Sequence, residues 1–253
     1  MRRIITLTTD FGLDDHYIGV MKGVILGINP EAHIIDITHS IPKYDVVKAA
    51  FKAQNIYPYF PKGTIHVVVV DPGVGGNRKP IAIESEGIFY IGPDNGVFSF
   101  ILDNNKGIHV VEITNPEYMR EEMSNTFHGR DIFAPIAAHI SLGVDINEIG
   151  EGLESPVSLN ISKPQILDNE IKGDIIYEDS FGNLITNIPG DMIRGSSKIH
   201  IDEFIIDSVA SSYDDVGKGE LLAIIGSSGF LEISVNQGSA SGLIRDRKLT
   251  VLK

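Results

Sequence analysis

A carboxylate and a guanidinium flank a glycine-rich loop that follows an apolar, strand-like run. The segment HVVVVDPGVGGNR, residues 66–78, places four valines before Asp71, three glycines after it, and Arg78 seven residues further on. Neither G-x-G-x-x-G nor G-x-x-x-x-G-K-[ST] occurs, and a strand-like run follows the loop, so a phosphate cradle is a poor interpretation. We interpret the glycines as room for a ligand to approach the backbone closely, with a structural Asp71–Arg78 ion pair as the alternative.

A second candidate lies at the end of the first strand-like run. The segment TTDFGLDDHY, residues 8–17, places Asp10 at this strand end. The carboxyl ends of parallel strands and the loops after them form the binding crevice of an α/β sheet, so Asp10 is placed to meet a ligand hydroxyl. For Asp14 and Asp15, a cap on the helix that follows is the alternative to a role in binding.

A histidine precedes an expected helix in TFHGRDIFAPIAAH, residues 126–139. His128 is thereby held at a rigid, partly exposed position, and Asp131 suits the N-cap or the first turn, because Pro135 is tolerated only near a helix start. His139 lies inside the apolar helix, where we expect it to be packed. For His128, a structural hydrogen bond is the alternative to catalysis. None of the eight histidines belongs to H-x-x-x-H or H-E-x-x-H, so we expect no metal site.

Two polar turns in the last third of the chain combine an aromatic ring with amide, hydroxyl and carboxylate groups. They lie in DSFGNLITN, residues 179–187, and GSSGFLEISVNQGSA, residues 226–240. A ring that stacks on a purine, beside amides that read the purine edge, is a common way to hold a nucleoside. Ordinary hairpin turns with core phenylalanines are the alternative. The candidate residues are Phe181, Asn183, Ser227, Ser228, Phe230, Glu232 and Asn236.

The elements that must position these residues fall into two groups. From Ile4 to about residue 150, strand-like and helix-like runs alternate, which predicts βαβ units and a mainly parallel sheet covered by helices. After about residue 165, closely spaced strand-like runs predict a small antiparallel β-domain. We expect an α/β N-terminal domain with a mainly parallel central sheet over 1–160 and a C-terminal all-β barrel-like domain over 168–253. The helix-like runs are 17–28, 46–57 and 132–143, and the Pro and Ser residues of 154–165 mark the boundary.

Composition narrows the class of protein further. Of the 253 residues, 42% are hydrophobic, which is ample for one large core or two ordinary ones. A formal net charge of −13 argues against a nucleic-acid partner, which would need clustered Lys and Arg. The chain has no cysteine, no apolar run near the roughly 20 residues of a membrane span, and a start that resembles a strand. We expect a cytoplasmic protein without a membrane or nucleic-acid partner.

Six motifs in a fixed order carry a resemblance along essentially the whole chain: TTDFGLDD, VVDPGVGGNR, IGPDNG, TFHGRD, FGNLITNI and SSGFLEISVNQG. The sequence resembles the SAM hydroxide adenosyltransferases, which hydrolyse S-adenosyl-L-methionine (SAM) to adenosine and are related to the fluorinase and chlorinase enzymes. The resemblance implies an N-terminal α/β domain and a C-terminal β-barrel-like domain. It also implies a homotrimer whose SAM sites lie between the N-domain of one subunit and the C-domain of its neighbour. SAM is then the substrate, and no cofactor is needed.

The resemblance assigns roles residue by residue. Asp71, Arg78 and His128 match the proposed catalytic trio, in which Asp71 or His128 takes a proton from water while Arg78 stays protonated. Asp10 matches the carboxylate that holds the ribose hydroxyls, and Tyr44 occupies an aromatic position that lines the sugar. The positions that match contacts to adenine and methionine are Asp179, Phe181, Asn183, Ser227, Ser228, Phe230 and Asn236.

Three departures separate this chain from the halogenating relatives. Those enzymes carry a tyrosine at the position of Asp71, an F-Y-S run at 127–129, and an insertion before the strand IFYIG. The sequence therefore favours the hydrolase branch. The alternatives are a SAM-dependent halogenase that forms 5′-halo-5′-deoxyadenosine, and a non-catalytic protein that binds adenosine or SAM.

Overall fold

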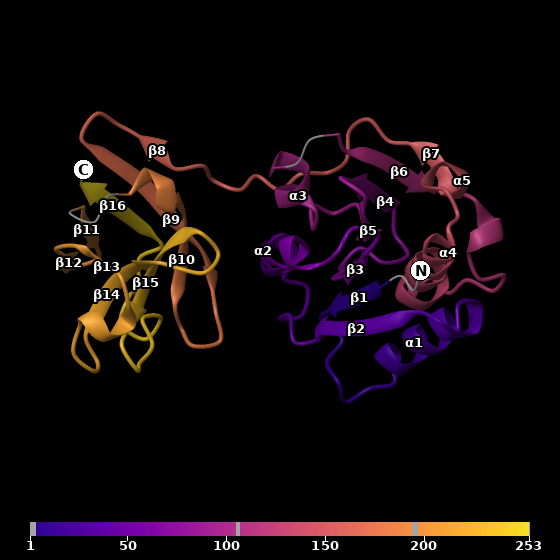
Figure 1. Cartoon of the computed structure of the whole chain (residues 1–253), viewed down its shortest axis with the longest axis horizontal. Coiled ribbons are helices and arrows are strands. Elements are labelled where there is room, and N and C mark those ends of the chain that lie inside the picture. The colour runs from indigo at the N-terminus through magenta and orange to yellow at the C-terminus, as the bar shows by residue number, and fades with distance from the viewer. Residues whose placement is uncertain (1–3, 105–106, 194–196, 253) are drawn as a thin grey trace. The chain divides into compact units, whose positions relative to one another are not determined.

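The computed structural model describes residues 4–104, 107–193 and 197–252 (Figure 1). The chain divides into two compact units, Met1–Leu159 and Asn160–Lys253. Each unit has its own buried hydrophobic core. No helix of the described ranges combines the length and the apolar character that a membrane crossing needs.

The N-terminal unit alternates strands and helices through its first half. Its strands are β1 (Ile4–Thr9), β2 (His33–Thr38), β3 (Ile65–Val69), β4 (Pro80–Ser85), β5 (Ile88–Pro93), β6 (His109–Ile113) and β7 (Gly150–Gly152). Its α-helices are α1 (Tyr17–Ile28), α2 (Val46–Ile56), α3 (Ser99–Asn104), α4 (Ala134–Leu142) and α5 (Ile146–Ile149). Short 3₁₀ turns lie at Tyr57–Tyr59 and Pro116–Tyr118, and a π-helical turn lies at Gly129–Phe133.

The sheet of this unit is mixed, which corrects the prediction of a mainly parallel sheet. Its strand order is β2-β1-β3-β5-β4-β6-β7. The three pairings from β2 to β5 are parallel, whereas the three pairings from β5 to β7 are antiparallel. The reason lies in Glu86 and Gly87, which join β4 to β5 with φ values of 53° and 82°. A connection of two residues closes a hairpin and leaves no chain for the crossover that parallel strands need.

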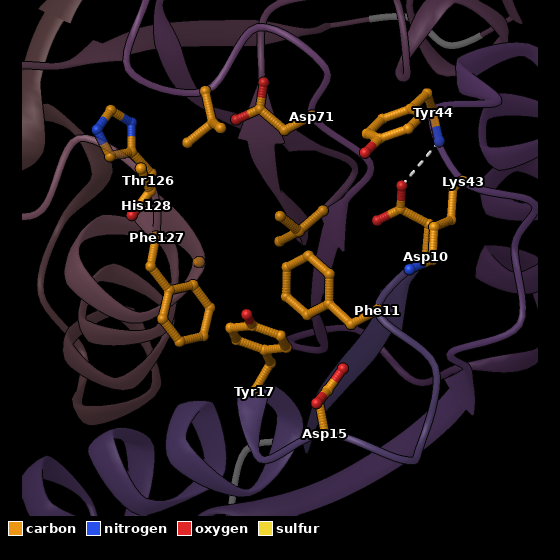
Figure 2. A pocket seen from close by; sticks show the side chains of 13 residues that line it. Asp10, Phe11, Asp15, Tyr17, Lys43, Tyr44, Asp71, Thr126, Phe127 and His128 are labelled. Atoms are coloured by element: carbon orange, nitrogen blue, oxygen red, sulfur yellow. Dashed lines mark hydrogen bonds between the residues drawn. The ribbon is translucent and has the colours of Figure 1, made fainter.

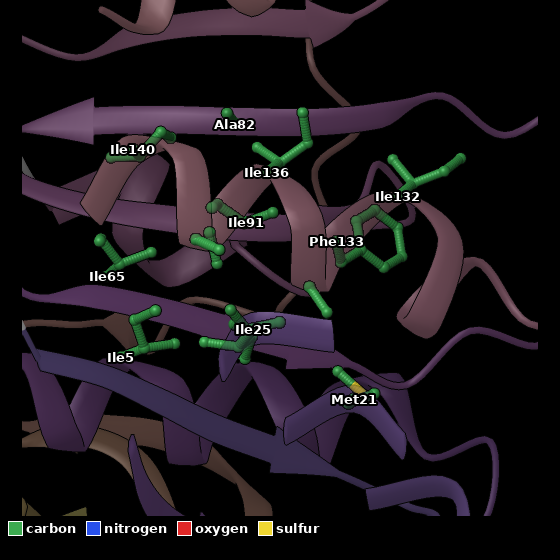
Figure 3. Close-up of a cluster of buried hydrophobic side chains, with 14 of the residues drawn as sticks. Ile5, Met21, Ile25, Ile65, Ala82, Ile91, Ile132, Phe133, Ile136 and Ile140 are labelled. Carbon is green, nitrogen blue, oxygen red and sulfur yellow. The ribbon is translucent and has the colours of Figure 1, made fainter. Parts of the chain in front are cut away.

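Helices cover both faces of this sheet. On one face α1 and α4 pack over β1, β3 and β5, as the labelled side chains of Figure 3 show. On the other face lie α2 and α3. The valine run is buried on both faces of the sheet. Val67 and Val69 pack on the face covered by α1 and α4, whereas Val68 and Val70 pack on the face covered by α2 and α3. Burial of each such side chain stabilises the fold by roughly 1.5–3 kcal/mol, so β3 is a firm base for Asp71 at its carboxyl end.

The C-terminal unit is built on a nine-stranded, barrel-like sheet. The strand order is β12-β11-β16-β9-β10-β15-β14-β13, with β8 paired to β9 outside this path. The strands are β8 (Gln165–Ile166), β9 (Glu170–Glu178), β10 (Leu184–Pro189), β11 (Lys198–Ile201), β12 (Phe204–Ile206), β13 (Val209–Ala210), β14 (Leu221–Ile225), β15 (Phe230–Val235) and β16 (Lys248–Leu252). Short 3₁₀ turns lie at Gly190–Met192 and Tyr213–Asp215. The two polar turns of the sequence join β9 to β10 and β14 to β15.

Candidate active site

Asp71, Arg78 and His128 form a connected trio of side chains. Arg78 Nε donates to Asp71 Oδ1 at 3.1 Å and to Oδ2 at 2.9 Å, and Arg78 Nη2 donates to Oδ2 at 2.6 Å. The same Nη2 donates to His128 Nδ1 at 2.5 Å. The side chains of Asp71 and Arg78 are only 5% and 9% exposed, and the Arg78 guanidinium lies 5.4 Å from the ring centroid of Phe133. The Asp71–Arg78 ion pair that the sequence allowed exists, and Arg78 shares it with His128.

The glycine-rich loop packs against protein, which corrects our interpretation of the glycines as room for a ligand. Gly75 has φ of +74°, and a Cβ atom there would lie 2.1 Å from the carbonyl oxygen of Asn125. A Cβ atom on Gly73 would lie 3.3 Å from Arg78 Cγ. The glycines therefore allow the loop after β3 to touch the segment that carries His128. Asn95 also secures this end of β3, because its side-chain amide donates to the Val70 carbonyl at 2.9 Å.

His128 stands at the start of a π-helical turn whose geometry follows from a proline. Across this turn the Ala134 N–H donates to the carbonyl of Gly129, five residues earlier. Pro135 has no N–H, so the Asp131 carbonyl lacks its α-helical partner. It accepts instead from the Arg120 N–H at 3.0 Å. The hydrogen bond between Arg120 and Asp131 thus connects the chain at Arg120 to the turn that holds His128.

The Asp131 side chain reinforces the same connection. It is fully buried, accepts from Arg130 Nε and Nη2 at 2.6 and 2.9 Å, and accepts from the Ser124 N–H at 2.8 Å. Burial opposes its ionisation, but the hydrogen bonds from Arg130 and Ser124 outweigh that effect and lower the pKa of Asp131. The prediction that Asp131 lies at the N-cap or in the first turn is confirmed for the first turn, since His128 occupies the N-cap position. From there Asp131 also anchors the segment that precedes His128.

The contact with Arg78 fixes the protonation state of His128. Arginine has no acceptor, so its hydrogen bond to Nδ1 requires that nitrogen to be unprotonated. Burial lowers the pKa of His128, and the Arg78 charge lowers it further, against the opposing charges of Asp71 and Asp131. At neutral pH the ring is therefore neutral and carries its proton on Nε2. His128 can donate a hydrogen bond to a ligand or a water molecule.

Asp10 follows β1, and its side chain is held by a residue with an unusual backbone conformation, Tyr44. Asp10 Oδ2 accepts from the Tyr44 N–H at 2.9 Å. Tyr44 has φ of 68°, the left-handed region that non-glycine residues seldom adopt. Within the described residues, Asp10 Oδ1 has no hydrogen-bond partner. This oxygen is available for a ligand.

One pocket of about 200 Å³ brings four predicted residues together (Figure 2). Asp10, Tyr44, Asp71 and His128 all line it. Arg78 reaches it through Asp71 and His128. Sequence reasoning considered Asp15 for a role in binding, and Asp15 also lines the pocket. It did not select the other lining residues, although most of them neighbour the chosen motifs: Phe11, Tyr17, Lys43, Val69, Val74, Thr126, Phe127 and Gly129. Their position beside Asp10, Tyr44, Asp71 and His128 in the chain was the available signal.

Two of the alternatives left open by the sequence now have an outcome. The N-cap position of α1 is His16, and no side chain caps this helix, so neither Asp14 nor Asp15 has a capping role. His139 packs against Tyr118, with ring centroids 5.1 Å apart, and burial lowers the pKa of His139. His139 is packed, as predicted.

The turn between β9 and β10 uses most of its polar groups internally. Asp179 Oδ1 accepts from the N–H groups of Phe181 and Asn183 at 2.8 and 2.9 Å, and its Oδ2 accepts from the Asn183 side chain at 3.0 Å. Asn183 is buried, whereas the Phe181 ring is 75% exposed. Internal hydrogen bonds therefore hold the turn, and the Phe181 ring is exposed to solvent.

The second polar segment of the C-terminal unit, residues 226–240, also combines internally bonded polar side chains with side chains that make no such bond within the described residues. Buried Glu232 accepts from Tyr213 Oη at 2.6 Å and from Ser234 Oγ at 2.8 Å. Buried Asn236 donates through its side chain to the Val216 carbonyl at 2.9 Å. In the part of the chain that the structure describes, the hydroxyls of Ser227 and Ser228 make no hydrogen bond. Phe230 begins β15 and is half-buried.

Comparisons with known proteins address the whole chain. Residues 5–150 match the SAM hydroxide adenosyltransferase N-terminal domain, and residues 173–247 match the SAM hydroxide adenosyltransferase C-terminal domain. The chain belongs to the SAM hydroxide adenosyltransferase family. The resemblance of the six sequence motifs is thereby confirmed.

Two of the similar proteins span nearly the full chain. An (R)-S-adenosyl-L-methionine hydrolase of Methanocaldococcus jannaschii is 38% identical, over 95% of this chain and 91% of the relative. A crystal structure of an uncharacterized conserved protein from Thermotoga maritima is 37% identical, with a TM-score of 0.91, over 98% of this chain and all of the other. A fluorinase of an Actinoplanes species is 26% identical over 73% of this chain and 71% of its own length. This chain is thus more similar to the named hydrolase than to that fluorinase.

Proposed function

We propose that this protein hydrolyses SAM to adenosine and L-methionine. The observation that carries the proposal is the Asp71–Arg78–His128 trio, which meets at a pocket that Asp10 also lines. This arrangement offers a buried carboxylate and a neutral imidazole to one water molecule. The named hydrolases among the relatives support SAM as the substrate.

The proposed reaction is a displacement at C5′ of the nucleoside. The oxygen of water forms a bond to C5′ while the C5′–S bond breaks, and the electron pair of that bond moves to sulfur. The sulfonium thereby becomes the neutral thioether of methionine, and one water proton passes to a base. A positively charged sulfur is already a good leaving group, so the scheme calls for no metal and no cofactor. The task of the protein is to hold the water in line with the bond that breaks.

We assign the base to Asp71. His128 accepts the Arg78 hydrogen bond at Nδ1 and keeps a proton on Nε2, so it orients the water as a donor. The Asp71 carboxylate then takes the proton. Arg78 stays protonated, holds Asp71 in place, and stabilises the hydroxide character that develops on the water. General-base assistance of this kind accelerates a reaction by about 10²–10⁴-fold.

The remaining contacts belong to the proposal. Asp10 Oδ1 would hold the ribose hydroxyls, with Tyr44 beside the sugar. The adenine and methionine contacts would come from the C-terminal residues Asp179, Phe181, Asn183, Ser227, Ser228, Phe230 and Asn236. Glu232, which the sequence also suggested for these contacts, would instead support the turn through Tyr213 and Ser234. The assembly would be a homotrimer in which neighbouring subunits share each site, and the location would be cytoplasmic.

The test is a product analysis with SAM in ¹⁸O-labelled water. We expect one labelled oxygen atom in adenosine, at the 5′ position, together with unlabelled methionine. Adenosine without label, or no adenosine at all, overturns the proposal. A halide series run in parallel should leave the product unchanged. Formation of 5′-chloro-5′-deoxyadenosine would identify a halogenase instead.

The sulfonium configuration can be tested with the same assay. The named relatives are hydrolases of the R epimer, so we expect faster adenosine formation from (R)-SAM than from (S)-SAM. Separate incubation of the two epimers gives the two rates directly. Equal rates would limit the proposal to SAM without regard to configuration.

A further inference from the structure

Three aromatic rings form a part of the pocket that the proposed chemistry does not use. Phe11, Tyr17 and Phe127 line the pocket together. Their ring centroids lie 5.7 Å apart for Phe11 and Tyr17, 5.9 Å for Phe11 and Phe127, and 5.1 Å for Tyr17 and Phe127. The interplanar angles of 56°, 72° and 86° are those of tilted and edge-to-face contacts, which aromatic rings favour. We call these three residues the aromatic wall.

The aromatic wall lies across the pocket from the proposed base. Figure 2 shows Asp71 and His128 on one side of the pocket and the rings of Phe11 and Tyr17 on the other. In a displacement, the entering and leaving atoms lie on opposite sides of the carbon that reacts. A water molecule held by Asp71 therefore directs the leaving sulfur toward the aromatic wall.

The structure already shows one of these rings holding a cation. The Arg130 guanidinium lies 5.3 Å from the ring centroid of Phe127. The Tyr17 ring stacks on His16 at 4.8 Å, yet Tyr17 remains 39% exposed and can be reached by a ligand. The faces of aromatic rings attract cations, and the attraction is strongest for weakly hydrated ones such as quaternary ammonium groups. A sulfonium belongs to this class, because its charge is shielded by three carbon substituents.

We propose that Phe11, Tyr17 and Phe127 form a sulfonium subsite that selects the cation over neutral thioethers. This inference rests on the proposed function, since it deepens the same site. The attraction acts on SAM and disappears in the product, because the sulfur of methionine is uncharged. The aromatic wall therefore favours binding of the substrate and release of the product at the same contact.

The pocket also contains charged groups that provide a competing explanation. Asp15 and Lys43 both line it. A preference for a cation caused by the Asp15 carboxylate would depend on charge alone and would survive the loss of a ring. A preference caused by the aromatic wall would survive neutralisation of Asp15. Substitutions of the two kinds therefore separate the explanations.

The experiment measures binding without turnover. In an Asp71→Asn background, calorimetry gives the Kd of SAM and of S-adenosylhomocysteine, which lacks only the methyl group and the charge. We expect Tyr17→Leu and Phe11→Leu to reduce the preference for SAM by roughly 3- to 30-fold each. Tyr17→Phe keeps the ring and should preserve the preference. Tyr59→Leu replaces a tyrosine that is 78% exposed outside the pocket, and it should also preserve the preference.

Two results would overturn the inference. The first is an equal loss of affinity for SAM and S-adenosylhomocysteine in both leucine variants, since the rings would then supply apolar surface alone. The second is loss of the preference in Asp15→Asn with no change in the leucine variants. Near-ultraviolet circular dichroism checks that each variant is folded, and the exposed Tyr17 position keeps one variant informative if Phe11→Leu unfolds. Adenosine formation by the wild type is measured separately, so failure of the proposed function is distinguishable from failure of the subsite.

Discussion

The N-terminal pocket and the C-terminal turns differ in how fully the protein already uses their polar atoms. In the pocket, Asp10 keeps one carboxylate oxygen without a partner in the described residues, and neutral His128 keeps an Nε2 donor. In the C-terminal turns, Asn183 bonds to Asp179 and Asn236 bonds to a carbonyl. Polar side chains of the pocket therefore have unused bonding capacity, whereas the buried asparagines of the C-terminal turns have little.

This difference separates candidate residues that stabilise their own turn, which we call framework residues, from those that can contact a ligand. A buried polar group whose hydrogen bonds are complete stabilises its turn, and its removal leaves unpaired partners. A group with unused bonding capacity, or an exposed ring, can gain a new contact without losing an old one. By this criterion Phe181, Ser227 and Ser228 are the C-terminal residues best suited to bind a ligand.

Asp71→Asn tests the pocket side of the comparison and has the largest expected effect. Loss of the base should lower kcat by about 10²–10⁴-fold, while the Kd of SAM stays within about threefold of the wild type. Steady-state kinetics and calorimetry measure the two quantities, with exposed Asp168→Asn as the control. An equal loss in kcat and affinity would assign Asp71 to binding rather than to proton transfer.

Acid should destabilise the N-terminal unit through His66, which belongs to β3. Burial lowers the pKa of His66 from 6.5 to about 4. Between these values the unfolded chain binds a proton that the folded chain does not, so the free energy of unfolding falls as the pH falls. The loss at pH 4 amounts to about 3 kcal/mol. Hydrogen exchange of β1 and β3 at pH 7 and pH 4 measures it, with His66→Gln expected to remove this dependence and exposed His33→Gln expected to retain it.

Glu232→Gln tests the framework side of the comparison. The Glu232 carboxylate accepts two hydrogen bonds. Burial raises the pKa of Tyr213 to about 12, and the hydrogen bond and charge of Glu232 contribute to this shift. Loss of the charge should lower the free energy of unfolding by about 2 kcal/mol and leave the Kd of SAM almost unchanged. Urea unfolding and calorimetry give both values, and exposed Glu203→Gln serves as the control. A weaker Kd at unchanged stability would mean that Glu232 contacts the substrate.

Phe181→Leu has the smallest expected effect. In contrast to Glu232→Gln, it should change the Kd of SAM and leave the free energy of unfolding almost unchanged. The ring is 75% exposed, so the free energy of unfolding should change by less than about 0.5 kcal/mol. If the ring stacks on adenine, the Kd of SAM should rise roughly fivefold, because one aromatic pair contributes about 1 kcal/mol. The same two measurements apply, with Tyr59→Leu as a matched exposed ring. An unchanged Kd would remove Phe181 from the proposed site.

Local patterns predicted the helices better than the sheet. The expected helix at 17–28 coincides with α1, and the one at 46–57 ends one residue later than α2. The third was expected from residue 132, but α4 begins at Ala134, because a π-helical turn precedes Pro135. Strand pairing depends on contacts between distant segments, which a pattern along one run does not contain. The short connection between IAIES and IFYIG was the one available signal for their antiparallel pairing, and the prediction of a mainly parallel sheet did not use it.

The site was predictable to the extent that chemistry lay in recognisable motifs. Asp10, Asp71 and His128 stood out as polar residues beside apolar runs, and the structure brings them to one pocket. The aromatic wall did not stand out, because phenylalanine and tyrosine beside a helix read as ordinary core residues. The glycines were misinterpreted, since a sequence does not show what a missing side chain makes room for. The roles of the C-terminal residues stay predictions.

The contact of Gly75 with Asn125 limits how this site can change by mutation. Any larger residue at position 75 meets a carbonyl oxygen, so the loop and the segment before His128 must be altered together. We expect random substitution within the loop to yield mostly inactive proteins, whereas the exposed side chains of Tyr17 and Lys43 can be replaced without such a backbone clash. Directed evolution toward other sulfonium substrates should therefore begin at those pocket positions and keep residues 73–76 as they are.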